Sequence, residues 1–142
     1  MMDDMNLTSM LVPDAVAFEP AILTQKQAFD RIAERLAPAI GVPPAGIAAA
    51  LAERERLGTT GFGGGTAIPH GRVAGTGGIR AAVVRFAQPV DWSAVDGLPV
   101  DLAVALVGPE DGGAEHLKAL ALVSRTLRDQ SIVAKLRGAD SA

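Results

Sequence analysis

The sequence predicts a single α/β domain in which helices flank a mixed β-sheet, and three observations carry that prediction. The elements occur in the order helices, strands and then helix, which is typical of layered α/β domains. Residues 100–107 are apolar at nearly every position, as expected of a strand buried on both faces. The chain has 142 residues, 49% of them hydrophobic, and neither an internal repeat nor an interdomain linker, so we expect one domain over residues 1–142.

The N-terminal part of the chain is predicted to contain a lead-in and two helices. Residues 1–10 are expected to form a polar, loosely ordered lead-in. A capping box at residues 24–27 opens the first helix, whose apolar positions recur at helical spacing as far as Ile40. A glycine and two prolines then end this helix and begin a second one over residues 45–57, which Gly58 terminates.

Extended segments are predicted after the glycine-rich middle of the chain. Residues 67–68 are short and extended, residues 79–86 form a strand rich in valine and alanine, and a turn follows at Asp96-Gly97 before the apolar strand described above. A helix is predicted from Ala114 to about Arg128, and a short final helix over residues 131–137.

Composition and charge exclude several function classes. The net charge is −3 and no basic stripe is present, which argues against nucleic acid as the main ligand. The chain has no cysteine, so disulfides and thiolate chemistry are excluded. No signal peptide is recognisable, and no apolar run approaches the roughly 20 residues that span a bilayer. We therefore expect a cytoplasmic protein with no membrane partner.

The most informative segment is a glycine-rich run over residues 58–72, which leads through Pro69 to His70, one of only two histidines. Glycine-rich loops often cradle phosphates, but the two common nucleotide motifs are absent. A P-loop beginning at Gly58 requires a lysine where Gly64 stands. The dinucleotide fingerprint ends on a threonine or an isoleucine instead of glycine or alanine. The run therefore does not predict a nucleotide site.

A metal site and a serine triad are weaker alternatives. His70 and His116 can supply two zinc ligands, with Glu115 or Asp111 as a third, but no histidine pair has the i, i+4 spacing of a metal-binding helix. A serine-type triad lacks a nucleophile-elbow motif.

The remaining chemistry makes His70 itself the nucleophile. A neutral imidazole, with a pKa near 6.5, has a lone pair that can attack phosphorus and form a phosphoramidate. Such a site needs donors around the phosphoryl oxygens and a group that orients the ring. The candidates are the backbone amides of Gly64, Gly65 and Gly71, the charge of Arg54 or Arg72, and a hydrogen bond from His116 near a helix N-terminus.

Each of these residues also has a purely structural interpretation. A histidine beside a glycine turn is often a satisfied loop residue, and His116 on an amphipathic helix is more often a surface or cap residue. Arg54 lies in a Glu-Arg-Glu-Arg run, which usually marks a solvated helix face.

The motif as a whole resembles a known family. Residues 54–61, Arg-Glu-Arg-Leu-Gly-Thr-Thr-Gly, and residues 63–72, with Gly-x-Gly-x-Ala-Ile-Pro-His-Gly-Arg, resemble the IIA domain of the bacterial phosphoenolpyruvate-dependent phosphotransferase system, of the fructose/mannitol and nitrogen-regulatory type. Residues 91–107 and the pattern His-Leu-x-x-Leu-x-x-Val from His116 resemble the same family. The similarity covers roughly residues 7–137, and the family fold is a mixed sheet flanked by helices.

The resemblance implies roles for individual residues. His70 matches the phosphoryl-accepting histidine, Arg54 the arginine that pairs with the phosphoryl group, and His116 a second histidine that supports the first without being phosphorylated. The residues expected to surround the phosphoryl group form a loop made of Thr60, Gly64, Gly65 and Gly71. No metal and no organic cofactor is implied.

The resemblance also implies partners. The donor is expected to be a histidine phosphocarrier of the HPr type. Nitrogen-regulatory members act on partner proteins according to their phosphorylation state, whereas sugar-transport members pass the phosphoryl group to a IIB domain. Gly71 directly after His70 and the absence of IIB or IIC segments favour the regulatory type.

Two departures from the family pattern stand out. Thr66 occupies a position that is usually aliphatic, which should be tolerated. Family members normally continue beyond residue 137 with one more acidic, leucine-containing helix. Here the sequence stops at residue 142, which leaves two alternatives: the protein lacks this helix, or the sequence is cut before it. The apolar surface that this helix covers is then expected to be exposed, which favours self-association into a homo-oligomer.

Overall fold

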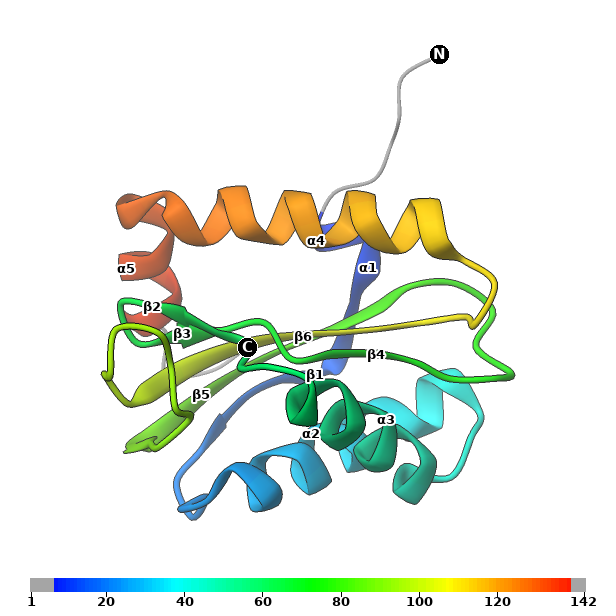
Figure 1. Ribbon diagram of the computed structural model, residues 1–142, viewed down its shortest axis with the longest axis horizontal. Helices are drawn as coiled ribbons and strands as arrows, with labels where there is room; N and C mark the ends of the chain where they lie inside the picture. The colour runs from blue at the N-terminus through cyan, green and yellow to red at the C-terminus, as the bar shows by residue number, and fades with distance from the viewer. Residues whose placement is uncertain (1–6, 139–142) are drawn as a thin grey trace.

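A computed structural model of the protein describes residues 7–138, and Figure 1 shows them as one sheet between two layers of helices. The elements in chain order are α1 (Leu7–Met10), β1 (Leu11–Glu19), α2 (Gln25–Ile40), α3 (Pro44–Arg56), β2 (Gly61–Gly63), β3 (Thr66–Ala67), β4 (His70–Arg72), β5 (Arg80–Val90), β6 (Val100–Gly108), α4 (Gly113–Arg128) and α5 (Gln130–Gly138).

The sheet is mixed, as predicted. Its strand order is β1-β5-β6-β3-β2, with β4 also paired to β6. The central strands β5 and β6 are antiparallel, whereas β1 pairs with β5, and β3 and β4 pair with β6, in parallel. Both β3 and β4 lie along the same strand, β3 beside Leu102 and Ala103, and β4 beside residues 106–108. The glycine-rich run therefore follows β6 from one end to the other.

The sheet separates two hydrophobic cores. One lies between the sheet and helices α2 and α3, below the sheet in Figure 1, and the other lies between the sheet and α4, above it. Strand β6 contributes to both, because successive side chains point to opposite faces of a sheet. Ala103, Ala105 and Val107 belong to the first core, and Leu102, Val104 and Leu106 to the second. This confirms the prediction of a strand buried on both faces.

The predicted helices are present with small shifts at their ends. At the start of α2, the backbone N–H of Gln27 donates to the Thr24 hydroxyl, and the N–H of Thr24 donates to the Gln27 side chain, so the capping box is confirmed. Gly41 ends this helix in the left-handed region, at φ 85°. No helix within residues 7–138 is long and apolar enough to cross a membrane.

One expectation for the N-terminal region is wrong, and one strand there was not predicted. Residues 7–10 of the expected lead-in form the short helix α1, and Met10 is buried; residues 1–6 lie outside the described part of the chain. Strand β1 follows, where the sequence indicated none. Its register shifts between Leu11 and Val16, so burial along the strand lacks the strict alternation by which strands are recognised. The strand also contains Pro13, which is typical of sheet edges.

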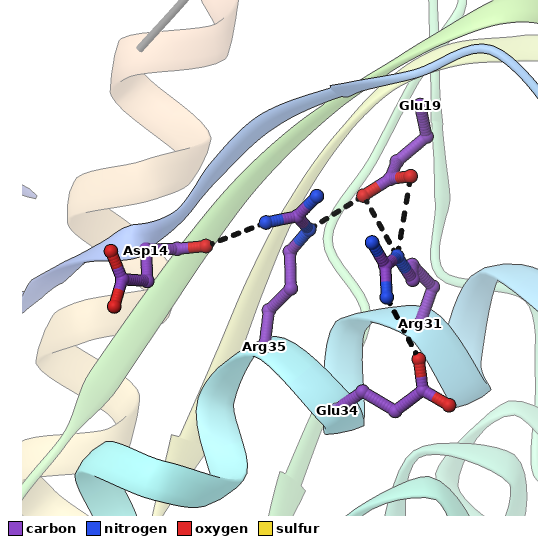
Figure 2. Close-up of polar contacts among 5 residues, drawn as sticks. All are labelled: Asp14, Glu19, Arg31, Glu34 and Arg35. Atoms are coloured by element: carbon purple, nitrogen blue, oxygen red, sulfur yellow. Dashed lines mark hydrogen bonds and ion pairs between the residues drawn. The ribbon is translucent and has the colours of Figure 1, made fainter.

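Polar contacts attach this edge strand to α2, as Figure 2 shows. The carboxylate of Glu19, only 6% exposed, accepts hydrogen bonds from Nε of Arg35 at 2.5 Å and from Nε of Arg31 at 3.2 Å. Arg35 also donates to the carbonyl oxygen of Asp14 at 2.9 Å, and Arg31 to the carboxylate of Glu34 at 3.0 Å. The contacts of Glu19 and Asp14 thus join β1 to α2 across 12 to 21 residues, while the backbone of β1 pairs with β5.

Candidate functional site

His70 is held at the carboxyl end of β6. It is the first residue of β4 and pairs with Leu106, whose N–H donates to the Pro69 carbonyl at 2.9 Å. The fixed φ of proline and this backbone bond stiffen the chain before the histidine. The backbone of β4 is therefore fixed. The imidazole itself is partly exposed and faces a surface depression.

Both ring nitrogens of His70 have partners. Nδ1 lies 2.8 Å from the carbonyl oxygen of Ile68, which can only accept, so Nδ1 carries the proton. Nε of Arg54, which can only donate, lies 3.1 Å from Nε2. The two contacts select one neutral tautomer, with the lone pair on Nε2 and directed at Arg54.

Arg54 reaches His70 from the last turn of α3. Its Nη1 donates to the Gly58 carbonyl at 2.8 Å, in the loop that follows the helix. One end of the guanidinium is therefore fixed to the backbone, and its Nε–H is aimed at the imidazole. The interpretation of Arg54 as part of a solvated helix face does not describe this position.

His116 approaches His70 from the first turns of α4. The ring centroids lie 5.6 Å apart, with 52° between the ring planes. The side chain is 4% exposed, and its buried Nδ1 has no hydrogen-bond partner within residues 7–138. Gly108 makes room for the ring, because a Cβ there would lie 3.2 Å from Nδ1 of His116. His116 is therefore neither a surface nor a cap residue.

The environment keeps both imidazoles neutral. Burial is the main cause that lowers the pKa of His116, to about 4, and the electrostatic influence of the neighbouring His70 and Arg72 lowers it further. Burial also lowers the pKa of His70, with a contribution in the same direction from Arg54, while the hydrogen bond to Ile68 opposes this shift. His70 consequently has an available lone pair at neutral pH.

The two histidines line an open depression of about 450 Å³. Its basic groups are Arg54 and Arg72, and its rim includes two exposed leucines, Leu57 at 72% and Leu117 at 65%. A lone pair, two arginines and a neutral imidazole suit transfer of an anionic group such as a phosphoryl group. The apolar rim suits contact with another protein.

The residues expected to form the phosphoryl loop do not lie together. Gly71 lines the depression beside His70. Gly64 and Gly65 form the turn between β2 and β3, beside the opposite end of β6, where Asp101 donates its N–H to Gly65. The N–H of Gly64 donates to Asp96 at 2.9 Å, so this amide is not available to a ligand at His70. The sequence did not reveal that the chain reverses here.

Thr60 lies between these two regions and is 8% exposed. It contacts Glu55 and Trp92 instead of facing the depression. The part played by the Ile68 carbonyl was also missed, since a backbone acceptor has no signature in residue type. No group of three or more histidine, aspartate or glutamate side chains within residues 7–138 is arranged to hold a metal ion.

Comparisons with known proteins identify the relatives of this chain. Residues 9–142 match the family described as phosphoenolpyruvate-dependent sugar phosphotransferase system, EIIA 2. A nitrogen regulatory protein of Bradyrhizobium diazoefficiens is 40% identical over 138 residues, which are 97% of this chain and 90% of that protein.

A solved structure leads to the same family, and another shares the fold. The nitrogen regulatory protein IIA-Ntr from Neisseria meningitidis has a TM-score of 0.87 and 32% identity, over 94% of this chain and 91% of that one. The fold is shared with the complex of enzyme IIAMtl and phosphorylated enzyme IIBMtl from Escherichia coli, at a TM-score of 0.74 and 18% identity over 92% of this chain and 91% of that one. The chain therefore belongs to the type 2 EIIA family of the phosphoenolpyruvate-dependent sugar phosphotransferase system and is similar to the nitrogen regulatory proteins within it.

Proposed function

We propose that the protein is a cytoplasmic phosphocarrier of the nitrogen-regulatory type. His70 accepts a phosphoryl group from a histidine phosphocarrier of the HPr type, and the phosphorylation state of the protein regulates partner proteins. The observation that carries the proposal is the tautomer of His70, whose Nε2 lone pair faces Arg54 while Nδ1–H is held by Ile68. The similarity to nitrogen regulatory proteins supports the regulatory type.

The transfer step follows from these contacts. The Nε2 lone pair of His70 attacks the phosphorus of the donor phosphohistidine, and a new N–P bond forms as the old one breaks. The electron pair of the broken bond remains on the imidazole of the carrier. Because Nε2 carries no proton, none has to leave, and the positive charge that develops on the ring is shared with the Ile68 carbonyl through Nδ1–H.

Arg54 and His116 stabilise the product in this proposal. The Nε–H of Arg54, which occupies the Nε2 lone pair in the free protein, turns to an oxygen of the incoming phosphoryl group, and the Gly58 carbonyl keeps the guanidinium close. His116 faces His70 as a neutral ring and supplies a further hydrogen bond. The exposed Leu57 and Leu117 contact the carrier around the reacting ring.

The decisive experiment is phosphoryl labelling. The protein is incubated with phosphoenolpyruvate, the phosphotransferase that uses it, and the HPr-type carrier. We expect one acid-labile, alkali-stable phosphoryl group, lost in His70→Ala and retained, at a lower rate, in His116→Asn. Since the chain has only two histidines, the two variants locate the label. Label that persists in His70→Ala would overturn the assignment.

The regulatory role has its own test. Affinity capture with the phosphorylated wild type and with His70→Ala should recover different partner proteins, and identical sets would contradict regulation by phosphorylation state. The second candidate function is that of a sugar-transport IIA component. It is favoured by the matching family, which belongs to the sugar phosphotransferase system. That function predicts rapid transfer of the label to a IIB domain, with the same partners throughout.

A further inference from the structure

The hydrogen bonds of Thr60 form a continuous network that reaches both ring nitrogens of His70. On the Nδ1 side, the Ile68 N–H donates to the Thr60 carbonyl at 3.0 Å, and His70 Nδ1–H donates to the Ile68 carbonyl at 2.8 Å. The backbone of Thr60 therefore fixes the residue that selects the tautomer of the imidazole.

The second branch runs through Glu55 to Arg54. The Glu55 carboxylate accepts the N–H of Thr60 at 2.9 Å and its hydroxyl at 2.5 Å, which ties the last turn of α3 to the loop after it. That loop contains Gly58, whose carbonyl holds Nη1 of Arg54. The position of the guanidinium beside Nε2 thus depends on the closure of the loop by Thr60.

The third contact anchors Thr60 to the core. Its hydroxyl oxygen accepts the indole N–H of Trp92 at 3.0 Å, and the Thr59 hydroxyl donates to the carbonyl of Trp92 at 3.0 Å. Trp92 is 2% exposed and packs against Phe29 and Phe86, with ring centroids at 5.5 Å and 6.3 Å. The hydroxyl of Thr60 therefore donates and accepts at once, between a carboxylate and a rigid aromatic cluster.

We propose that Thr60 is a positioning residue for phosphoryl transfer, and that the Glu55–Thr60–Trp92 hydrogen bonds set both the tautomer of His70 and the place of Arg54. The inference rests on the proposed function. This positioning role differs from the one expected from the sequence for Thr60 in the phosphoryl loop. Thr60 touches no reacting atom and acts through Glu55 and Ile68.

The first test compares labelling rates of Thr60→Val, which removes the hydroxyl at nearly constant volume, and Thr60→Ser, which keeps it. We expect Thr60→Val to be labelled about tenfold more slowly, as for the loss of a hydrogen bond to a charged group, and Thr60→Ser to recover most of the rate. The matched control is Thr66→Val. Thr66 is 2% exposed and donates to the Gly63 carbonyl at the other end of β6, so its variant should be labelled at the wild-type rate.

The second test requires no carrier protein. Ring ¹⁵N chemical shifts report the tautomer of His70, and we expect the Nδ1–H form to lose population in Thr60→Val while Thr60→Ser and Thr66→Val resemble the wild type. The indole N–H shift of Trp92, the only tryptophan, should change in Thr60→Val alone. A buried threonine with a merely structural role would not change the tautomer.

The outcomes separate this inference from the proposed function. If His70→Ala abolishes labelling but Thr60→Val has the wild-type rate and tautomer, the positioning role is overturned while the phosphocarrier function stands. If the wild type takes no label, the phosphocarrier function fails, and the tautomer measurement alone decides whether Thr60 positions the ring. Should Thr60→Val not fold, Glu55→Gln weakens the same contacts, and an unchanged rate and tautomer in that variant would equally overturn the inference.

Discussion

The two ends of β6 each hold an arginine that donates to a glycine carbonyl, yet the two arginines differ in what else they contact. At the His70 end, Arg54 donates to Gly58 and to the neutral lone pair of the imidazole. At the opposite end, Arg137 donates to Gly64 and to the carboxylate of Asp101, at 2.9 Å. The charge of Arg137 is compensated within the chain, whereas an incoming anion can take over the bond that Arg54 makes.

The glycines of the two ends differ in the same way. The amide of Gly64 is taken by the Asp96 carboxylate, and the turn that contains it closes the β2–β3 hairpin. Gly71 brings β4 close to α3, where Ala50 lies, and so brings Arg54 near His70. A glycine-rich run thus serves chain reversal at one end and close packing at the other, and only the second concerns the site.

The largest effect is expected from Arg54→Gln. Removing a donor from the developing phosphoryl charge should lower the labelling rate about 100- to 1000-fold. The measurement is the single-turnover rate with the phosphorylated carrier, and Arg137→Gln is the matched control at the other end of the sheet. Equal labelling rates in the two variants would show that Arg54 and Arg137 do not differ in their contribution to phosphoryl transfer.

Acid should destabilise the folded protein through His116. Because the pKa of His116 falls from 6.5 to about 4 on folding, the unfolded chain binds the proton first as the pH drops. This stabilisation is complete above pH 6.5 and is lost as the pH falls toward 4, by up to about 3 kcal/mol.

Urea unfolding at pH 7 and at pH 4.5 measures this loss. His116→Gln should lose less stability between the two pH values than the wild type. The His70→Gln variant should also lose less stability than the wild type, because the pKa of His70 is lowered too, and so it measures the contribution of the second ring. A pH dependence unchanged by His116→Gln would show that this ring titrates normally.

The glycine comparison is tested by two alanine variants. In Gly71→Ala, the new Cβ would lie 3.0 Å from Cβ of Ala50 and 3.1 Å from its carbonyl carbon, which forces α3 outward. We expect labelling to be about tenfold slower, because α3 holds Arg54. Gly64→Ala meets open space but keeps φ at +63°, so it should cost about 1 kcal/mol of stability without changing the labelling rate. Slower labelling in Gly64→Ala would show that Gly64 contributes to the site around His70.

The smallest effect is expected for the stability of Arg137→Gln. The ion pair with Asp101 is one-third exposed on each side, and such pairs contribute about 0–1 kcal/mol. Chemical denaturation should therefore show a small loss, which 0.5 M salt reduces because salt screens the pair in the wild type. A loss of several kcal/mol would mean that Arg137 has an additional structural role.

The sequence predicted those parts of the fold whose signal is local. The capping box at Thr24 and Gln27, the apolar stripe of α2 and the continuous apolar run of β6 each depend on residues close together in the chain. Strand β1 was missed because its bulged pattern is recognisable only beside β5, and its attachment to α2 through Glu19 spans 12 to 16 residues.

For the site, the sequence by itself determined which chemistry is available: an imidazole behind a proline, an arginine before the glycine run and a second histidine far along the chain. The tertiary structure decided how these groups are used, because pairing of β3 and β4 with β6 separates Gly64 and Gly65 from His70 and brings His116 to it. Proton location and pKa depend on burial and on a backbone carbonyl, which arise only when distant segments pack together.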